Sequence, residues 1–319
     1  MSAAARTTRL APDGRAPGRS EPPAPVHVDA VTGPAVASAH EARVHDLAPM
    51  AAPRRSHRHV SSAKVRAAAA AIHALARWSP YVESEVCGLD RLVRPGAVCI
   101  DVGAAGGIYT MALSRLAGPT GTVLSVEPLP FANRHVARLL RAERASNVRR
   151  RALALGAEPA LDVMHVPVGR FGLVTGRSYL DRLADGPDPN DEFAGQLDVR
   201  VAVDTLDALC AREALERVDF VKIDVEGAEL QVLDGGSRVV QAYRPAVLVE
   251  IEARHAARYG LLPEQSMSWF LERGYSMHTW RHGWRAAASI EPSVRNYLFV
   301  PRRLEDAAPE PERPLAIVA

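Results

Sequence analysis

Cysteine is scarce in this chain of 319 residues. The three that are present, Cys87, Cys99 and Cys210, are too few and too widely spaced for a disulfide framework or a cysteine-based zinc site. We therefore expect them to be buried as small apolar side chains, in a protein of the reducing cytoplasm.

Long apolar runs and a strong net charge are missing as well. No stretch reaches the ~18 consecutive apolar residues of a membrane span, and the N-terminus shows no apolar signal-peptide core. The formal net charge is only +2, whereas a nucleic-acid-binding surface needs a clustered basic face. We expect a cytoplasmic protein without a membrane or nucleic-acid partner, and the sequence leaves its oligomeric state open.

Lysine is almost absent. Of the 39 basic residues only Lys64 and Lys222 are lysines, and all the others are arginines. Arginine essentially never loses its proton, whereas the pKa of lysine shifts readily when the side chain is buried. Lys222 therefore indicates a position where the tunable charge of a lysine matters.

The composition divides the chain into four parts. Residues 1–60 are rich in Ala, Pro, Arg, Ser and His and offer too little apolar surface to offset chain entropy, which predicts a disordered tail. Residues 61–94 carry two apolar patterns of helical spacing and predict an N-terminal helical cap that could close over the site. Residues 95–302 form the main domain, and residues 303–319 predict a second disordered tail.

Within the main domain, short apolar runs alternate with helical patterns. This order predicts an α/β fold with a central, mostly parallel sheet, helices on both faces and an antiparallel closing strand. Residues 156–200 read as irregular, with one added strand at 161–166. The expected strands are 97–103, 122–128, 147–155, 220–227, 245–252, 275–281 and 296–301, and the expected helices are 106–118, 131–145, 228–242 and 264–274.

A loop of small residues, "CIDVGAAGGIYT", follows the first of these strands. Its spacing from Gly103 does not match the G-x-G-x-x-G pattern of dinucleotide folds, and no Gly-Lys-Ser/Thr phosphate loop is present. Instead, Asp101 precedes the loop and suits a cationic amino group, while Glu127 ends the next strand and suits the hydroxyls of a ribose. An amino group and a ribose together describe S-adenosylmethionine. The alternative is that Asp101 caps the helix and Glu127 is a solvated strand end.

The segments "IDVGAAGGIYT", "VEPLP", "VDFVKIDVEGAELQVLDGG", "PAVLVEIE" and "NYLFVP" resemble, in order and spacing, the FkbM-type methyltransferases over residues 80–302. The resemblance implies a Rossmann-like, S-adenosylmethionine-dependent methyltransferase that acts on a hydroxyl of a natural product, sugar or glycan. The resemblance carries over Asp101, Gly103 and Gly107 as loop residues and Glu127 as the ribose ligand. We also expect Ala104, Ala105, Pro128 and Asp224 to bind the cofactor.

Two departures from the family pattern are visible. The family loop often has asparagine where this chain has Ala105, so a polar contact to the cofactor is lost. An acid on the adenine side is also missing, because Glu158 comes late, and we expect the adenine contacts near residues 153–156 instead.

Three charges interrupt the strand "DFVKIDVEG", which we expect to lie beside the first strand. Alternation would place Lys222, Asp224 and Glu226 on one face, and we predict them as the catalytic residues. Asp224 is the candidate base for a hydroxyl proton. Lys222 is a base only if burial deprotonates it; otherwise it keeps Asp224 charged or stabilises an oxyanion.

Two other interpretations of these charges stay open. In one, Lys222 and Asp224 form an ion pair that ends the strand while Glu226 caps the next helix. In the other, Asp224, Glu226 and Glu250 bind Mg²⁺, which we do not favour because no histidine or second aspartate completes the set.

The sequence does not identify the methyl acceptor. We expect a small molecule or carbohydrate, bound by residues 156–200 and the C-terminal strands, with Ser178 either a wall of that pocket or an ordinary loop serine. An N-methyltransferase and a non-catalytic S-adenosylmethionine-binding protein are the alternatives.

Overall fold

The computed structural model describes residues 27–28, 83–129, 131–132, 147–188, 190 and 192–302. Several predicted features fall outside these residues. They are the first helix of the cap, nearly all of the helix at 131–145, the tail at 1–60 except for a two-residue strand, and the tail at 303–319.

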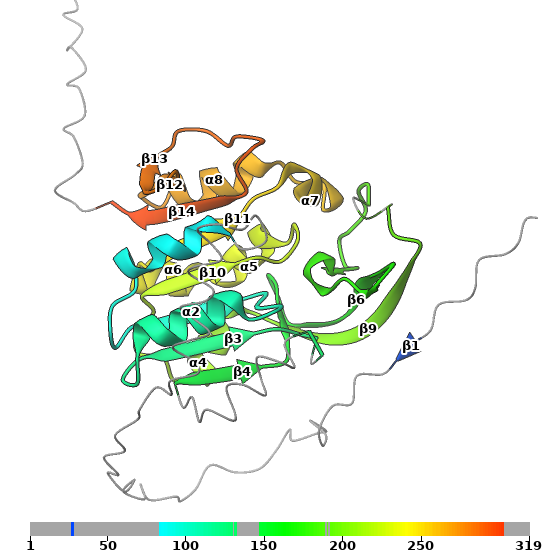
Figure 1. Cartoon of the computed structure of the whole chain (residues 1–319), viewed down its shortest axis with the longest axis horizontal. Helices are drawn as coiled ribbons and strands as arrows, with labels where there is room; N and C mark the ends of the chain where they lie inside the picture. The colour runs from blue at the N-terminus through cyan, green and yellow to red at the C-terminus, as the bar shows by residue number, and fades with distance from the viewer. Residues whose placement is uncertain are drawn as a thin grey trace, which may run out of the picture.

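A central sheet carries the fold, with strand order β13-β12-β14-β11-β10-β2-β3-β4 (Figure 1). The pairs from β4 to β11 are parallel, β14 is antiparallel to β11, and β12 is antiparallel to β14. The predicted α/β fold of Rossmann-like type, with an antiparallel closing strand, is therefore confirmed. The strands are β2 (Val98–Val102), β3 (Thr122–Val126), β4 (Val148–Arg151), β10 (Phe220–Ile223), β11 (Ala246–Glu250), β12 (Tyr275–Trp280), β13 (Trp284–Ala286) and β14 (Asn296–Pro301).

Helices cover both faces of this sheet because its strands bury side chains on both sides. Cys99 and Phe220 pack with helix α2 (Ile108–Ala117) and the 3₁₀ helix η1 (Ser84–Arg91), which is the second helix of the predicted cap. Their strand neighbours Ile100 and Val221 pack on the opposite face. The helices there are α4 (Leu206–Arg212), α5 (Glu229–Gly235), α6 (Ser237–Tyr243) and α8 (Pro263–Leu271).

A second sheet contains part of the segment that was expected to be irregular. Strands β6 (Ala160–Gly169) and β9 (Gly195–Asp204) pair antiparallel along nearly their whole length. The strand expected at 161–166 lies within β6, and residues 181–188, 190 and 192–194 are irregular as expected, but β9 and the shorter strands within 156–200 were not predicted. The shorter strands of the second sheet are β1 (His27–Val28), β5 (Ala154–Leu155), β7 (Gly172–Leu173) and β8 (Tyr179–Leu180).

The second sheet lies beyond the carboxyl ends of β3 and β4, as Figure 1 shows. It has its own apolar cluster, in which Met164, Val166, Val199 and Val201 pack with Leu129 from the loop after β3. This packing places the second sheet next to the edge of the main sheet where a ligand would bind.

Two helical details differ from expectation. The helix expected at 228–242 is broken into α5 and α6 at Gly236, where a Cβ atom would lie 2.6 Å from the side chain of Leu206. A short helix after β11, α7 (Ala253–Arg258), was not foreseen and contributes to the site described below. In the described part of the chain, no helix has the length and apolar character needed to cross a bilayer.

Candidate active site

The site forms where the carboxyl ends of β2 and β10 meet. These strands are direct neighbours, with Lys222 opposite Asp101 and Ile223 opposite Val102, as the sequence predicted. The chain continues from β2 to β3 on one side, while β10 continues to β11 on the other. In open α/β sheets, ligands bind outside the carboxyl ends of strands at such a switch point.

The glycine loop after β2 touches the end of β10 through its backbone. A Cβ atom on Gly103 would lie 1.7 Å from the carbonyl oxygen of Asp224, and Gly103 has a φ of 75°. Only glycine fits this position. The N–H groups of Gly103 and Ala104 both donate to the carbonyl oxygen of Val126 at 3.0 Å, which ties the loop to β3. Gly107, with a φ of 77°, then begins α2.

Glu127 is held in a fixed orientation at the end of β3. Its two carboxylate oxygens accept hydrogen bonds from the N–H groups of Ala105 and Leu129, each at 2.8 Å. Burial raises the pKa of Glu127 to about 7, while these backbone hydrogen bonds oppose the shift. Glu127 is therefore not a solvated strand end, and each of its oxygens keeps a lone pair for a ligand.

Asp101 lies against the first turn of α2, as the capping alternative expected. The hydroxyl of Thr110 donates to its carboxylate at 2.5 Å. Burial raises the pKa of Asp101 to about 6, with the hydrogen bond from Thr110 and the charge of Lys222 opposing the shift.

Two adjoining cavities open around this loop. The larger, with about 970 Å³ of empty space, is lined by Gly103, Ala105, Glu127, Pro128 and Asp224 among others. The smaller, of about 530 Å³, brings Asp101, Ala104 and Lys222 together with Gly103, Ala105 and Asp224. Of the predicted cofactor-binding residues, only Gly107 lines neither cavity.

The residues of these cavities fit S-adenosylmethionine. Leu153, Leu155 and Met164 offer an apolar surface for an adenine at one end of the larger cavity. Glu127 offers two acceptor oxygens for a ribose, and Asp101 lines the smaller cavity, where an ammonium group can bind. Glu158, the late acid, lines a different cavity.

Lys222 is fully buried, with 0% of its surface exposed. Its Nζ donates to Oδ1 of Asn296 at 2.8 Å and lies 3.5 Å from Oδ2 of Asp224. Burial alone would lower the pKa of Lys222, but the carboxylates around it, led by Asp224, outweigh burial and raise the pKa. The amine is therefore held as an ammonium ion, which argues against its use as a base.

Carboxyl groups crowd around this ammonium ion. Asp224 lines both cavities, and Glu250 lies beside it at the end of β11. Burial and the hydrogen-bonded Asp224 raise the pKa of Glu250 well above its usual value. Glu83, at the start of η1, lines both cavities and accepts a hydrogen bond of 2.5 Å from the hydroxyl of Tyr109.

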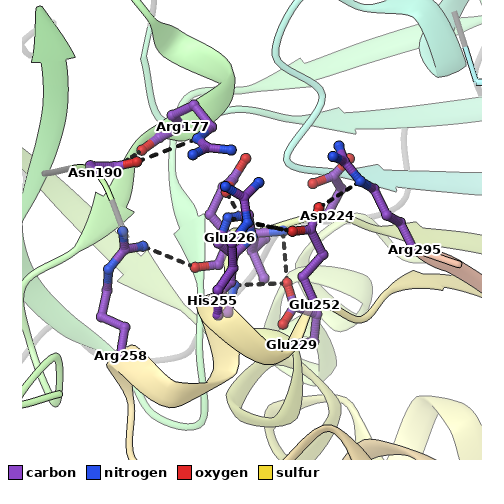
Figure 2. Close-up of polar contacts among 12 residues, drawn as sticks. Arg177, Asn190, Asp224, Glu226, Glu229, Glu252, His255, Arg258 and Arg295 are labelled. Atoms are coloured by element: carbon purple, nitrogen blue, oxygen red, sulfur yellow. Dashed lines mark hydrogen bonds and ion pairs between the residues drawn. The ribbon is translucent and has the colours of Figure 1, made fainter. Parts of the chain in front are cut away.

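Glu226 does not continue the alternation of β10, and this expectation is corrected. The strand ends at Ile223, and Glu226 has a left-handed backbone with a φ of 56°. Its Oε2 lies 3.0 Å from Nδ1 of His255 (Figure 2). Burial raises the pKa of Glu226, and the hydrogen bond from His255 opposes the shift.

The side chain of Glu229, and not that of Glu226, accepts hydrogen bonds from the backbone of the turn that precedes α5. Its Oε1 accepts hydrogen bonds from the N–H of Gly227 at 3.0 Å and of Val225 at 3.3 Å. A Cβ atom on Gly227 would lie 2.2 Å from the carbonyl oxygen of His255. Glycine at this position therefore lets the turn pack against α7, and so brings His255 to Glu226.

Sequence reasoning missed the polar residues that follow β11. Glu252 accepts from Nε of Arg254 at 2.6 Å and lies 2.9 Å from Nε of Arg295, and all three line the larger cavity with His255 (Figure 2). The run "EIEARH" after a strand that ends at the binding edge was the available signal. Ser178, for which a pocket wall was one of two expectations beside an ordinary loop serine, lines this cavity.

Comparison with known proteins gives a family match. Residues 101–277, more than half of the chain, match the family model described as "Methyltransferase FkbM domain". No curated protein shows significant similarity to this chain.

Similar solved structures include three methyltransferases or related proteins. Methyltransferase FkbM from Methylobacillus flagellatus KT is 16% identical with a TM-score of 0.40, and the match covers 66% of this chain and 48% of that one. Fibrillarin from Aeropyrum pernix, in complex with S-adenosyl-L-methionine, is 15% identical with a TM-score of 0.36, covering 66% and 67%. The O-methyltransferase TomG from Streptomyces achromogenes, also in complex with the cofactor, is 12% identical with a TM-score of 0.36, covering 76% and 82%. The match therefore spans about half the length of the Methylobacillus flagellatus chain.

Proposed function

The chain belongs to the FkbM family of S-adenosylmethionine-dependent methyltransferases, and from this premise we propose that it methylates a hydroxyl oxygen of a small natural product or a sugar. One observation carries the proposal. The glycine loop, Glu127 and Asp224 open onto the same cavity as the polar cluster around His255. A cofactor on the loop and an acceptor on the cluster would therefore meet at Asp224.

Three features of the chain would bind the cofactor. Gly103 and Ala105 line the cavity with little side-chain bulk, the carboxylate of Glu127 can accept hydrogen bonds from two ribose hydroxyls, and Leu153 and Leu155 offer an apolar surface to the adenine. When bound, S-adenosylmethionine would supply the methyl group: the acceptor oxygen would form a bond to the methyl carbon as the bond from that carbon to sulfur breaks in line with it, and S-adenosylhomocysteine would leave. Holding both reactants in this alignment can lower the barrier by several kcal/mol, roughly 7 or more in favourable cases.

We propose Asp224 as the residue that takes the proton of the hydroxyl. It follows β10 directly and lines both cavities, so its carboxylate borders the cofactor and acceptor sides. Lys222 lies 3.5 Å from it and remains an ammonium ion, so Asp224 has a buried cation beside it. Of the roles considered for Lys222 from the sequence, we therefore favour that of a charged partner of Asp224 over that of the base.

The acceptor side of the cavity is polar and carries charges of both signs. Carboxylates, arginines, His255 and Ser178 line it, and the buried hydroxyl of Ser178 has no hydrogen-bond partner among the described residues. Such a surface offers both donors and acceptors to a molecule rich in hydroxyl groups. This is the reason to favour a sugar or a hydroxylated natural product over an apolar acceptor.

The test is a turnover assay with the full-length protein, S-adenosylmethionine and panels of hydroxylated and amine acceptors. Mass spectrometry detects the methylated product, and NMR locates the methyl group. We expect an O-methyl product, and the Asp224→Asn variant should turn over at least about tenfold more slowly while binding the cofactor normally. Methylation of nitrogen would overturn the hydroxyl assignment, and cofactor binding without turnover on any acceptor would favour a binding protein.

A further inference from the structure

Two histidines of this protein each lie between two carboxylates, but only one has both ring nitrogens bonded. In the second sheet, His165 Nδ1 lies 2.7 Å from Asp198 and Nε2 lies 2.9 Å from Asp181. In the site, His255 Nδ1 lies 3.0 Å from Glu226, whereas Nε2 lies 4.0 Å from Glu252 and has no hydrogen-bond partner among the described residues. A buried polar atom without a partner is costly, and His255 is only 3% exposed.

The surroundings of His255 have the spacing of a metal site. One ligand atom each from Glu226, Glu250 and His255 can be chosen so that all three lie within 4.8 Å of one another. Around an octahedral ion with bonds of about 2.1 Å, neighbouring ligand atoms lie about 3.0 Å apart and opposite ones about 4.2 Å apart. The 3.0 Å contact between Nδ1 of His255 and Glu226 matches neighbouring ligands, so Nδ1 is the ring nitrogen that would bind the ion, and the proton on Nε2 would then face Glu252, 4.0 Å away.

We propose that Glu226, Glu250 and His255 bind one divalent transition-metal ion in the larger cavity. The ligands come from the turn after β10, the end of β11 and α7, three segments that fold together only in the native structure. One imidazole and two carboxylates suit Mn²⁺, Fe²⁺ or Zn²⁺ better than the all-oxygen preference of Mg²⁺ or Ca²⁺. The set considered from the sequence contained Asp224 and no histidine, and His255 now takes that place.

A neighbouring group of carboxylates is the weaker site. One carboxylate oxygen each from Glu83, Asp224 and Glu250 can also be chosen so that all three lie within 4.8 Å of one another. However, the Lys222 ammonium ion lies 3.5 Å from Asp224 and already supplies a cation there. Within the described residues, neither Glu226 nor Glu250 forms an ion pair with an arginine, because Arg254 and Arg295 both contact Glu252.

The position of the proposed ion in the cavity points to a role in binding the acceptor, and this role alone rests on the proposed function. The three ligands leave coordination positions free, and they line the same cavity as Glu127 and Asp224. A bound divalent ion holds hydroxyl oxygens as ligands and lowers their pKa. The acceptor class that follows is a molecule with two adjacent oxygen donors, such as a vicinal diol of a sugar.

The site is tested by metal binding to the full-length protein, without cofactor or acceptor. The protein is stripped with a chelator and titrated with Mn²⁺, with free Mn²⁺ followed by electron paramagnetic resonance, and then with Zn²⁺ by calorimetry. We expect one ion per chain. His255→Ala and Glu226→Gln should each weaken binding at least about tenfold, because each removes a ligand. His165→Ala is the matched control, since it removes a carboxylate-flanked histidine whose nitrogens are both bonded, and it should bind as wild type.

Folding of each variant is checked through its affinity for S-adenosylmethionine. Where His255→Ala loses cofactor binding too, Glu226→Gln and Glu250→Gln provide the test. The proposal is overturned if no stoichiometric ion binds, or if the variants that retain cofactor affinity bind the ion as wild type does. Ion binding that depends on these ligands, in a protein that methylates no hydroxyl, would refute the proposed acceptor and leave the metal site standing.

Discussion

At the scale of single residues, the buried ammonium ion of Lys222 organises the charges of the site. It lies 3.5 Å from Asp224 and 5.2 Å from the centre of the Tyr109 ring, and its pKa is raised by Asp224, Glu83 and Glu250 against the effect of burial. The compact ammonium group of Lys222 donates a hydrogen bond to Asn296. An arginine at this position would need space for a planar guanidinium group with five N–H donors. This explains why a lysine occurs here in a chain that otherwise uses arginine.

Replacing this lysine should reduce turnover more than it reduces cofactor binding. In Lys222→Met, Asp224 and Glu250 lose their buried counter-ion, so we expect kcat to fall at least about tenfold and the free energy of unfolding to fall by about 3 kcal/mol. Lys222→Arg should also lose activity, because the larger head does not fit. Calorimetry with S-adenosylmethionine, steady-state kinetics and urea unfolding measure the three quantities.

The matched control for this change is Arg217→Met. Arg217 pairs with Asp219 at the start of the same strand, but its side chain is 62% exposed. A surface pair contributes little, about 0–1 kcal/mol, so this variant should keep both stability and kcat. A Lys222→Met enzyme with wild-type kcat would refute the role given to the ammonium ion.

Ala105 is a second residue with a specific prediction. Its φ of 37° lies in the left-handed region, which asparagine tolerates better than alanine, and its N–H donates to Glu127. Ala105→Asn should therefore stabilise the protein by about 1 kcal/mol or less and tighten cofactor binding severalfold through the added amide. Thermal unfolding and calorimetry check this. Ala105→Gly relieves the backbone without an amide, so equal affinity gains in both variants would argue against an amide contact.

At the scale of elements, one arginine joins the second sheet to the catalytic edge. Arg258 on α7 lies 3.6 Å from the centre of the Tyr179 ring and pairs with Asp188 at 3.0 Å. It also donates to the carbonyl oxygen of Glu226 at 3.2 Å (Figure 2). Through Arg258, the segment that carries β8 is held against the turn that presents Glu226 and His255.

Loss of this arginine should loosen the acceptor side of the cavity. Arg258→Ala leaves Asp188 and the turn without a buried partner, and we expect an unfolding free energy lower by about 3 kcal/mol. KM for the acceptor should rise at least about fivefold, while KM for S-adenosylmethionine should change less than about twofold. This difference is at least about 0.5 kcal/mol, and kinetics at saturating co-substrate resolve it.

Arg273→Ala is the comparison for this prediction. Arg273 also stacks on an aromatic ring, 3.9 Å from the centre of Trp269, but it lies in the turn after α8 and lines neither cavity. It should lower stability without changing either KM. A change in both KM values of Arg258→Ala to the same degree would show a general loss of structure and contradict the specific link.

The elements that could be predicted are those whose signals are local. The loop from Asp101 to Gly107, Glu127 and strand β10 follow from short apolar runs, small residues and spacing, and the structure brings them together at one edge. His255 could not be predicted, because it reaches Glu226 only through the left-handed turn and the close approach at Gly227. Strand β9 was missed although its valines alternate, since its partner β6 is about thirty residues distant and nothing local marks that pairing.

At the scale of the whole molecule, buried carboxyl groups connect stability with the cofactor. Burial raises the pKa of Glu127 and of Glu229 to about 7, from a usual value of 4.5. A carboxyl whose pKa is raised on folding stabilises the native state below its unfolded pKa, and that stabilisation is lost as the pH rises through the folded value. For these two groups the loss falls between about pH 4.5 and 7 and is on the order of 3 kcal/mol each.

Cofactor binding should have the opposite pH dependence, because the ribose hydroxyls are bound best by ionised Glu127. As the pH rises from 5.5 through the pKa of about 7, the unfolding free energy of the free protein should fall. The affinity for S-adenosylmethionine should instead rise, by up to about tenfold per pH unit below that pKa, and with it the increase in Tm at saturating cofactor. Asp101 and Asp224, which face the same cavities, are unchanged in Glu127→Gln, so this variant isolates Glu127. It should bind the cofactor weakly and with little dependence on pH; an unchanged pH profile in Glu127→Gln would show that another group of the cavities carries the linkage and would remove Glu127 as the titrating ribose ligand.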